Sequence, residues 1–436
     1  MERLRGSLEC DPVRMCEILV GLPDVEVIGL DASGLVLEVH VECRRARTGC
    51  PSCGVVAHIK DQRPVRFVDL PVAGRPMALI WHKRRWRCPD ADCPTGSWTE
   101  EDERIASSRM AITTRAGRWV TEQVGRCARS VNEVAVELGC DWHTVNDAVV
   151  AYGAALVDLP GRFGTVDALG LDEVLFVREG PYHLQYFSTQ IVDVGRGQLL
   201  DVVPGRKGEN PKAWLEAQGR EWLDAVCFAT LDLSSPYRAV LDAVIPNATQ
   251  VADPFHVVKL ANDKLDECRR RVQNETLGHR GHKRDPLYRC RRLLTKAHER
   301  IDDHGRDKLL GLLRAGDPRG EVATAWHAKE AVRELYAHRD PALALQWVDE
   351  LSADMVDPDQ PVEVRSLGRT LKRWRLHIAA WHTAQVSNGP TEAINNLIKR
   401  VKRAAFGFTN FRNYRVRSLL YAGKPDWAQL NLIGLV

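Results

Sequence analysis

The sequence predicts a multidomain α/β protein, and three observations support that prediction. The chain has 436 residues, which exceeds the roughly 100–200 residues of one ordinary domain. Residues 25–42 and 165–204 alternate apolar and polar side chains as strands do, whereas residues 255–382 follow a helical pattern almost throughout. Four of the 12 cysteines are grouped between positions 50 and 93. We therefore expect a metal-binding β domain, a short helical domain, and a mixed sheet interrupted by an all-helical insertion.

Composition places the chain among ordinary globular proteins. Hydrophobic residues make up 44% and charged residues 27%, which excludes a disordered or fibrous class. The net charge of +3 says little about partners, because the basic residues are concentrated locally. The first twenty residues lack the apolar core of a signal peptide, and nowhere do eighteen apolar residues run together. These features predict a soluble, cytoplasmic protein without a membrane partner.

Residues 1–100 are expected to form an N-terminal zinc-binding β domain. A hairpin is predicted over residues 25–42, and two further β-like stretches lie between the halves of the cysteine group. The spacing C-x2-C, 34 residues, C-x4-C supplies four thiolates, which suits tetrahedral Zn²⁺ and leaves no open position for chemistry. We predict a structural zinc ion with four ligands, Cys50, Cys53, Cys88 and Cys93. The alternative is four reduced cysteines with coincidental spacing. The nearby basic residues Arg84 and Arg85 could hold phosphates.

Residues 101–162 are expected to form a helix-turn-helix DNA-binding domain. A helical pattern over residues 113–129 is followed by two short helices, with Ser130 as a cap and a glycine-bearing break at residues 138–140. DNA contacts are then predicted at the front of the second short helix, from His143, Thr144 and Asn146. The alternative is a structural three-helix bundle without DNA contacts.

Residues 163–256 are predicted to form the first part of a catalytic core. Three strands, one helix over residues 210–225, a strand, a helix and a last strand follow one another, which is the order of a ribonuclease-H-like mixed sheet. Asp172 lies in the first strand, and Asp232 ends the strand expected beside it. Each acid also has an ordinary interpretation, as an exposed strand residue or a strand end. Glu173 and Asp193 are weaker candidates for the same site.

Residues 257–385 are expected to form the helical insertion, and residues 386–436 the last part of the core. In a helix over residues 390–403, Glu392 and Asn396 share one face with two basic residues, whereas apolar residues share the opposite face. Seven basic residues and no acid follow between Lys399 and Arg417. We predict that this segment holds the DNA backbone through Asn396, Lys399, Arg400, Lys402, Arg403, Arg412 and Arg415. Glu392 could instead be an ordinary first-turn glutamate.

The three acids Asp172, Asp232 and Glu392 together suit a pair of hard divalent cations. Carboxylate oxygens are the ligands that Mg²⁺ prefers, and two such ions serve phosphodiester chemistry in many enzymes. We therefore predict two Mg²⁺ (or Mn²⁺) ions at a catalytic site made by these residues. The basic residues that follow Glu392 would then hold a DNA strand across that site.

This set of residues resembles the DDE transposases of bacterial insertion sequences, in particular the ISL3 family. The matching segments are CPSCG with CPDADC, GLDEVLF, LDLSSPY, VADPFHVVKLAN and SNGPTEAINNLIKRVKRAAFGFTNFRNYRVR, which together span most of the chain. The resemblance implies that Asp172, Asp232 and Glu392 are the catalytic triad. It also implies a supporting role near that site for Asp253 and His256, which match a family motif.

The resemblance further implies binding of terminal inverted repeats and metal-dependent cleavage and transfer of DNA strands. Double-stranded DNA at the element ends and at the target would be the partner, bound by a homodimer that pairs two ends at the bacterial nucleoid. Two alternatives remain open. A non-catalytic zinc and helix-turn-helix regulator would bind DNA without metal-dependent cutting, and a structure-specific nuclease would cut without joining strands.

Overall fold

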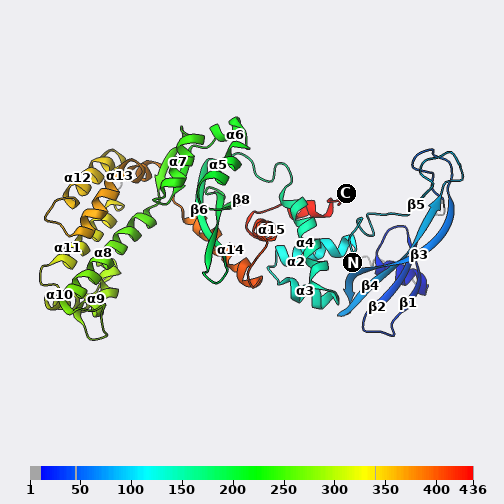
Figure 1. Cartoon of the computed structure of the whole chain (residues 1–436), viewed down its shortest axis with the longest axis horizontal. Helices are drawn as coiled ribbons and strands as arrows, with labels where there is room; N and C mark the ends of the chain where they lie inside the picture. The colour runs from blue at the N-terminus through cyan, green and yellow to red at the C-terminus, as the bar shows by residue number, and fades with distance from the viewer. Residues whose placement is uncertain (1–10, 45–46, 339, 436) are drawn as a thin grey trace, which may run out of the picture. The chain divides into compact units, whose positions relative to one another are not determined.

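The computed structural model describes residues 11–44, 47–338 and 340–435. Its contacts divide the chain into two compact units. The first unit contains the described residues up to Phe163 together with those from Asn396 onward, and the second runs from Gly164 to Asn395. Figure 1 shows the elements of each unit along the chain. No helix in the described part of the chain is long and apolar enough to cross a membrane.

The first unit begins with a short helix and a five-stranded sheet of order β1-β2-β4-β3, in which β5 also pairs with β4. β1 and β2 form the antiparallel hairpin predicted over residues 25–42, and β3 and β4 form a longer one. Val39, Val41, Leu79 and Trp81 lie in the buried core of this sheet. The elements are α1 (Pro12–Val20), β1 (Val25–Asp31), β2 (Leu37–Cys43), β3 (His58–Val72), β4 (Arg75–Arg87) and β5 (Ser97–Thr99).

Helices complete the first unit, and the sequence predicted the first three of them. α3 begins with a capping box, in which Ser130 and Glu133 bond each other's backbone N–H groups. Gly139 ends α3 at φ +64°, and Asp141 then caps α4, so only a tight turn separates the two helices. The helices are α2 (Thr114–Gly125), α3 (Val131–Leu138), α4 (Trp142–Val157) and α15 (Phe411–Ala422), followed by a 3-10 turn η2 (Trp427–Asn431).

The second unit contains a five-stranded mixed sheet of order β10-β9-β6-β7-β8. β10, β9 and β6 are parallel, whereas β6, β7 and β8 form an antiparallel meander. The strands are β6 (Ala168–Glu179), β7 (Leu184–Asp193), β8 (Gln198–Pro204), β9 (Phe228–Leu231) and β10 (Thr249–Ala252). This order of elements along the chain is the predicted one.

Connecting helices in this unit differ from the prediction at one point. The single helix expected over residues 210–225 is divided into α5 (Glu209–Glu216) and α6 (Arg220–Asp224). Gly219 lies between them at φ +84°, a conformation that does not continue a helix and that glycine adopts without a side-chain clash. α7 (Ser235–Val244) follows β9 as predicted.

The helical insertion of the second unit leaves the sheet after β10 and returns to it before α14. Its helices lie together in Figure 1 and pack pairwise, most extensively α12 against α13 and α8 against α11. They are α8 (Pro254–Leu277), α9 (Pro286–Thr295), α10 (Asp303–Gly316), α11 (Glu321–Leu335), α12 (Pro341–Met355) and α13 (Val362–Ala384), with a 3-10 turn η1 (His298–Arg300). α14 (Gly389–Ala404) follows, and its residues up to Asn395 belong to the second unit.

Candidate functional site

Three aspartates lie side by side at the carboxyl edge of the parallel strands. Leu171 on β6 pairs with Leu231 on β9, which pairs in turn with Ala252 on β10. Asp172, Asp232 and Asp253 each directly follow one of these paired residues. The common register therefore brings the three carboxylates to the same level of the sheet, at the edge where open α/β sheets bind their ligands.

His256 connects these aspartates with Glu392. Its Nδ1 lies 2.9 Å from Asp232 and 3.1 Å from Asp253, and its Nε2 lies 3.7 Å from Glu392. His256 stands in the first turn of α8, whose N-terminus Asp253 caps. The structure thus gathers Asp172, Asp232, Glu392, Asp253 and His256 at one place in the second unit.

Close contact with β6 positions the beginning of α14. A Cβ atom at Gly170 would overlap the Thr391 side chain, so only glycine permits this approach. Glu392, one residue after Thr391, remains partly exposed in the first turn of the helix. Gly170, two residues before Asp172, therefore allows the Glu392 helix to approach the sheet.

Two asparagines that sequence reasoning missed hold the carboxylates in place. Asn388 is fully buried; its backbone N–H donates to Asp253 at 2.8 Å, and its side-chain amide donates to Asp232 at 3.1 Å. Asn395 donates to Asp172. Both lie on the segment that carries Glu392, Asn388 directly before α14 and Asn395 within it, so their nearness to Glu392 in the sequence was the available signal. The sequence prediction had singled out the exposed neighbour Asn396 instead.

The electrostatics of the site reflect crowded acids. Burial, and then the charge of Asp232, raise the pKa of Asp172 to about 7. Burial alone would lower the pKa of His256, but hydrogen bonds to Asp232 and Asp253 raise it to about 10. The imidazolium form of His256 therefore offsets part of the negative charge that the acids bring together.

The weaker candidates occupy different surroundings. Glu173 lies beside the Tyr237 hydroxyl, as expected for the neighbour of Asp172 on a strand. Asp193 is buried, accepts a hydrogen bond from the backbone N–H of Arg196 at 2.9 Å, and so closes the turn between β7 and β8. Neither residue shares the surroundings of Asp232 and His256.

The donor set suits a hard divalent cation. The donor set consists mainly of carboxylate oxygens. Next to Asp172, the buried amide oxygen of Asn395 has no hydrogen-bond partner among the described residues, so it is also available as a ligand. The three acids are more widely spaced than the cysteine cluster, whose ligand atoms all lie within 4.8 Å of one another. A cation at this site would favour the charged form of Asp172, whose pKa is now raised by burial and then by the charge of Asp232.

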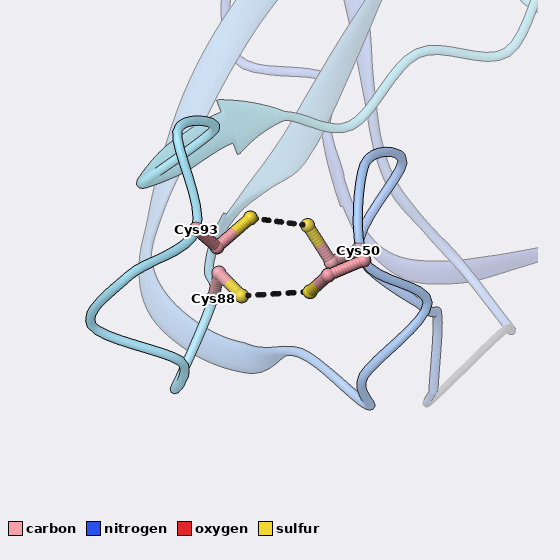
Figure 2. Close-up of side chains that lie close together, drawn as sticks. Cys50, Cys88 and Cys93 are labelled. Carbon is pink, nitrogen blue, oxygen red and sulfur yellow. Dashed lines mark hydrogen bonds between the residues drawn. The ribbon is translucent and has the colours of Figure 1, made fainter.

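The four cysteines of the first unit form a separate cluster. Cys50 and Cys53 flank a turn closed by a hydrogen bond from the Gly54 N–H to the Cys50 carbonyl, and Cys88 directly follows β4. Figure 2 shows the thiols converging on one point, with Sγ–Sγ separations of 3.6 Å (Cys50–Cys93) and 3.5 Å (Cys53–Cys88). Four sulfurs at 2.3 Å from one tetrahedral ion would lie about 3.8 Å apart, so the cluster fits Zn²⁺.

Local hydrogen bonds favour the ligand form of one of these thiols. The backbone N–H of Cys53 lowers the pKa of Cys50 to about 6. Zinc binds the thiolate, so the lowered pKa of Cys50 favours metal binding, whereas burial raises the pKa of Cys88 and opposes it in the absence of the ion.

The basic residues predicted to bind DNA from β4 are engaged by acids. Arg84 is buried and lies 3.3 Å from Glu42 and 3.8 Å from Glu100. Arg85 lies 3.2 Å from Asp61. A phosphate would have to compete with these carboxylates for either guanidinium group.

The residues predicted at the front of α4 differ in exposure. His143 is exposed, whereas Thr144 is bound to the capping carboxylate of Asp141 through its backbone and its hydroxyl. Asn146 is buried and accepts a hydrogen bond from the Asn413 amide at 3.1 Å. The front of α4 therefore meets the C-terminal helix α15 within the first unit.

Most of the basic residues of α14 and α15 that were predicted to bind DNA are exposed, including Lys399 and Arg403 on the face predicted from their helical spacing. Exposed members are Asn396, Lys399, Arg400, Arg403 and Arg412, while Ile398 and Val401 are buried. Lys402 is partly buried, which lowers its pKa. Arg415 forms an ion pair with Asp158 at 2.9 Å. A row of cations thus faces solvent along α14.

Comparison with known families identifies the class of this protein. A family model described as the zinc-finger of transposase IS204/IS1001/IS1096/IS1165 matches residues 46–93, which include all four clustered cysteines. The ISL3 transposase model matches residues 169–418, more than half of the chain. The chain therefore belongs to the ISL3 family of insertion-sequence transposases, which confirms the resemblance noted in the sequence.

Individual relatives span most of the chain. The transposase for insertion sequence element IS1001 of Bordetella parapertussis is 25% identical over 384 residues, covering 86% of this chain and 89% of that protein. The transposase for insertion sequence element IS1557 of Mycobacterium tuberculosis (strain CDC 1551 / Oshkosh) is 28% identical over 360 residues, covering 74% and 78%.

Proposed function

We propose that this protein cleaves and transfers DNA strands by a DDE mechanism at Asp172, Asp232 and Glu392. The observation that carries the proposal is the register of β6 and β9, which puts two acids at one sheet edge within reach of the Glu392 helix. Two Mg²⁺ ions held by these carboxylates would activate the attacking oxygen and stabilise the leaving oxygen of a phosphodiester.

The remaining residues of the site position this set. Asn395 fixes the orientation of Asp172, and Asn388 fixes that of Asp232. Asp253 holds His256 between Asp232 and Glu392, so that its charge balances theirs. The mixed sheet has the strand order and acid placement expected of a ribonuclease-H-like core, which supports treating residues 163–256 and the beginning of α14 as its parts and residues 257–385 as an insertion. The described residues from Asn396 onward belong to the first unit, although the sequence prediction assigned them to the core.

DNA binding is assigned to three parts of the chain. The cations along α14 and α15 would hold the phosphate backbone, and α3 with α4 would act as a helix-turn-helix that reads the terminal inverted repeats. Zinc bound by the cysteine cluster would keep the loops that carry the four cysteines folded. We further propose that a homodimer pairs two element ends, and that the protein acts on chromosomal DNA in the bacterial cytoplasm.

The test is cutting of a labelled duplex that carries the element's own flanking ends, with Mg²⁺ or Mn²⁺. Wild type should cut and join strands, and Glu392→Gln should bind the ends equally but lose cutting by about a thousandfold or more. Glu173→Gln serves as the matched control, because that acid lies beside Tyr237 and not in the Asp232 cluster. If the wild type binds the ends but does not cut them with metal, the protein is a DNA-binding regulator. If it cuts without forming joined products, it is a nuclease.

A further inference from the structure

A small cavity opens in the first unit where three segments meet. It holds about 130 Å³ and is lined by the start of α3, the front of α4, and the turn and helix that follow α14. One water needs about 10–15 Å³ of such space, so the cavity admits a group the size of a planar ring. Neither the carboxylate site nor the cysteine cluster includes any of its lining residues.

The lining is rich in amides, hydroxyls and aromatic rings and contains no carboxylate. Asn146 and Asn413 both line it and are joined by their own hydrogen bond, and Trp142, Phe406 and Phe408 supply the rings. A cationic ligand would find no counter-charge in this lining, and a phosphate would find one cation. Flat, neutral groups that hydrogen-bond at their edges fit best, which is the chemistry of a nucleobase.

Arg417 provides a separate sign of a missing partner. It is 5% exposed, lines the cavity, and packs over the Phe408 ring with its guanidinium carbon 5.2 Å from the ring centre. Its Nε–H is buried and has no hydrogen-bond partner among the residues that the structure describes. Buried donors are nearly always satisfied, and the carbonyl or ring nitrogen of a base is an acceptor of the right kind.

Phe406 stands at the edge of this cavity in an unusual conformation. Its side chain is 94% exposed, and its backbone adopts φ +55°, a region that bulky residues rarely occupy. A large exposed ring in a strained turn gains nothing from packing in the free protein. Stacking of the ring on a bound base would offset the free-energy cost of this backbone conformation, since base–aromatic stacking is favourable for any base.

We propose that this cavity binds one nucleobase that has left the base stack of the element-end DNA, with Phe406 stacking on it. The proposal rests on the DNA-binding function assigned above. The exposed cations Arg403 and Arg412 on either side of the turn would hold the flanking phosphates. A base that leaves the stack and enters the cavity is recognised at its edge by the Asn146–Asn413 pair and by Arg417.

The test compares binding of end duplexes that carry a single mismatch at each position in turn, without added divalent metal. Taking a base out of the stack is easier where its pairing is already lost, so one position should bind about tenfold tighter or more when mismatched. Phe406→Asn, which removes the ring but tolerates a positive φ, should abolish that gain, and Phe406→Tyr should retain it. A 5-iododeoxyuridine at that position should crosslink to the peptide that contains Phe406.

Tyr182→Asn is the matched control, because Tyr182 is 88% exposed on a turn of the second unit outside the cavity. A single-stranded oligonucleotide of the same end tests the source of the base: if it shows the Phe406-dependent gain and no duplex mismatch does, the base comes from an already unpaired strand. The proposal is overturned if no substrate shows such a gain while the wild type still binds the ends. Failure of the wild type to prefer element ends over unrelated DNA would instead contradict the proposed function.

Discussion

The backbone N–H of Asn388 donates a 2.8 Å hydrogen bond to the Asp253 carboxylate, 135 positions earlier in the chain. Asp253 stands between β10 and α8, where the helical insertion begins, and Asn388 stands where it ends. One carboxylate therefore joins the two ends of the insertion, caps α8, and holds His256 beside Asp232. Packing of α13 against β10 holds the end of the insertion at the sheet in addition to this bond.

Replacing Asp253 with alanine should destabilise the second unit. The change removes the cap of α8 and leaves the buried N–H of Asn388 without its acceptor, which together should cost about 2–4 kcal/mol. Hydrogen exchange of peptides from α8 and α14, recorded as a function of urea concentration, measures this loss in the free energy of unfolding. The control is Asp302→Ala, which removes the cap of α10 alone and should cost about 1 kcal/mol. Equal losses in the two variants would show that the bond to Asn388 contributes nothing.

Adjacent asparagines on α14 should have separable roles. Asn395→Ala removes the donor to Asp172, so cleavage should fall by about 10–100-fold while affinity for the ends stays unchanged. Asn396→Ala alters an exposed side chain and should weaken end binding slightly without changing the rate of bound complexes. Single-turnover cleavage and fluorescence anisotropy distinguish the two effects. The assignment of Asn395 is wrong if both variants change affinity alone.

The cysteine cluster should hold one zinc ion per chain. Metal analysis of the purified protein should give about one equivalent, and Cys88→Ser should lose most of it, because three thiolates bind zinc far less tightly than four. Cys227→Ser changes an exposed thiol outside the cluster and should keep the metal. Chelation should unfold the loops around Cys50 and Cys93 while leaving the second sheet protected from hydrogen exchange. Full metal content in Cys88→Ser would contradict the four-cysteine site.

Arg84 should contribute more to the stability of the fold than to DNA binding. Its removal leaves Glu42 and Glu100 without their buried partner, and the loss should be about 2 kcal/mol. Arg85→Ala, at a more exposed ion pair, should change stability by about 0–1 kcal/mol. Urea midpoints test both values. A clear fall in the salt dependence of end binding by Arg84→Ala would instead restore the phosphate contact predicted from the sequence.

Arg271 should hold the insertion together in a pH-dependent way. It contacts Glu363 on α13 and Glu321 on α11, and although burial would raise the pKa of Glu363, Arg271 lowers it below its usual value. A lowered pKa means that this stabilisation is complete above the unfolded-state pKa of about 4.3 and disappears as the pH falls through the folded-state pKa.

In Arg271→Ala, the largest influence left on the pKa of Glu363 is burial, which raises it against the backbone N–H of Glu363 and the Cys268 thiol, so we expect the sign to reverse. The variant should lose about 2–3 kcal/mol at pH 7 and recover part of it at pH 5, whereas the wild type should change little between these values. Urea unfolding followed by circular dichroism at both pH values measures the difference. Arg270→Ala is the control, because that side chain is 62% exposed and pairs with Asp266. A loss that is the same at pH 5 and pH 7 would exclude Glu363 as its cause.

Local patterns predicted much of this fold because each element carried its own signal. The β1–β2 hairpin, the Ser130 cap and the succession of strands and helices after residue 165 follow from alternation, capping chemistry and turn residues, which depend on near neighbours. The division between α5 and α6 was missed because a glycine inside a helical pattern is often tolerated, and the local pattern does not show that Gly219 adopts a positive φ.

Features that depend on distant residues were not predictable from the same patterns. Asn388 and Asn395 become important only because β9, β10 and β6 bring Asp232, Asp253 and Asp172 to them. Likewise, nothing in the sequence around Arg84 indicates that Glu42 and Glu100 lie beside it. Composition shows that a basic cluster exists, and tertiary structure decides which of its members face solvent.

The shared register of β6, β9 and β10 also determines where the chain can tolerate a change in length. Deleting one residue within β9 would turn Asp232 to the opposite face of the sheet, because side chains alternate along a strand. By contrast, helices can be added or removed between α8 and α13 without moving any of the three acids, since the segment leaves and returns at Asp253 and Asn388. Related chains should therefore differ widely in the size of this helical segment and hardly at all in the lengths of the three strands.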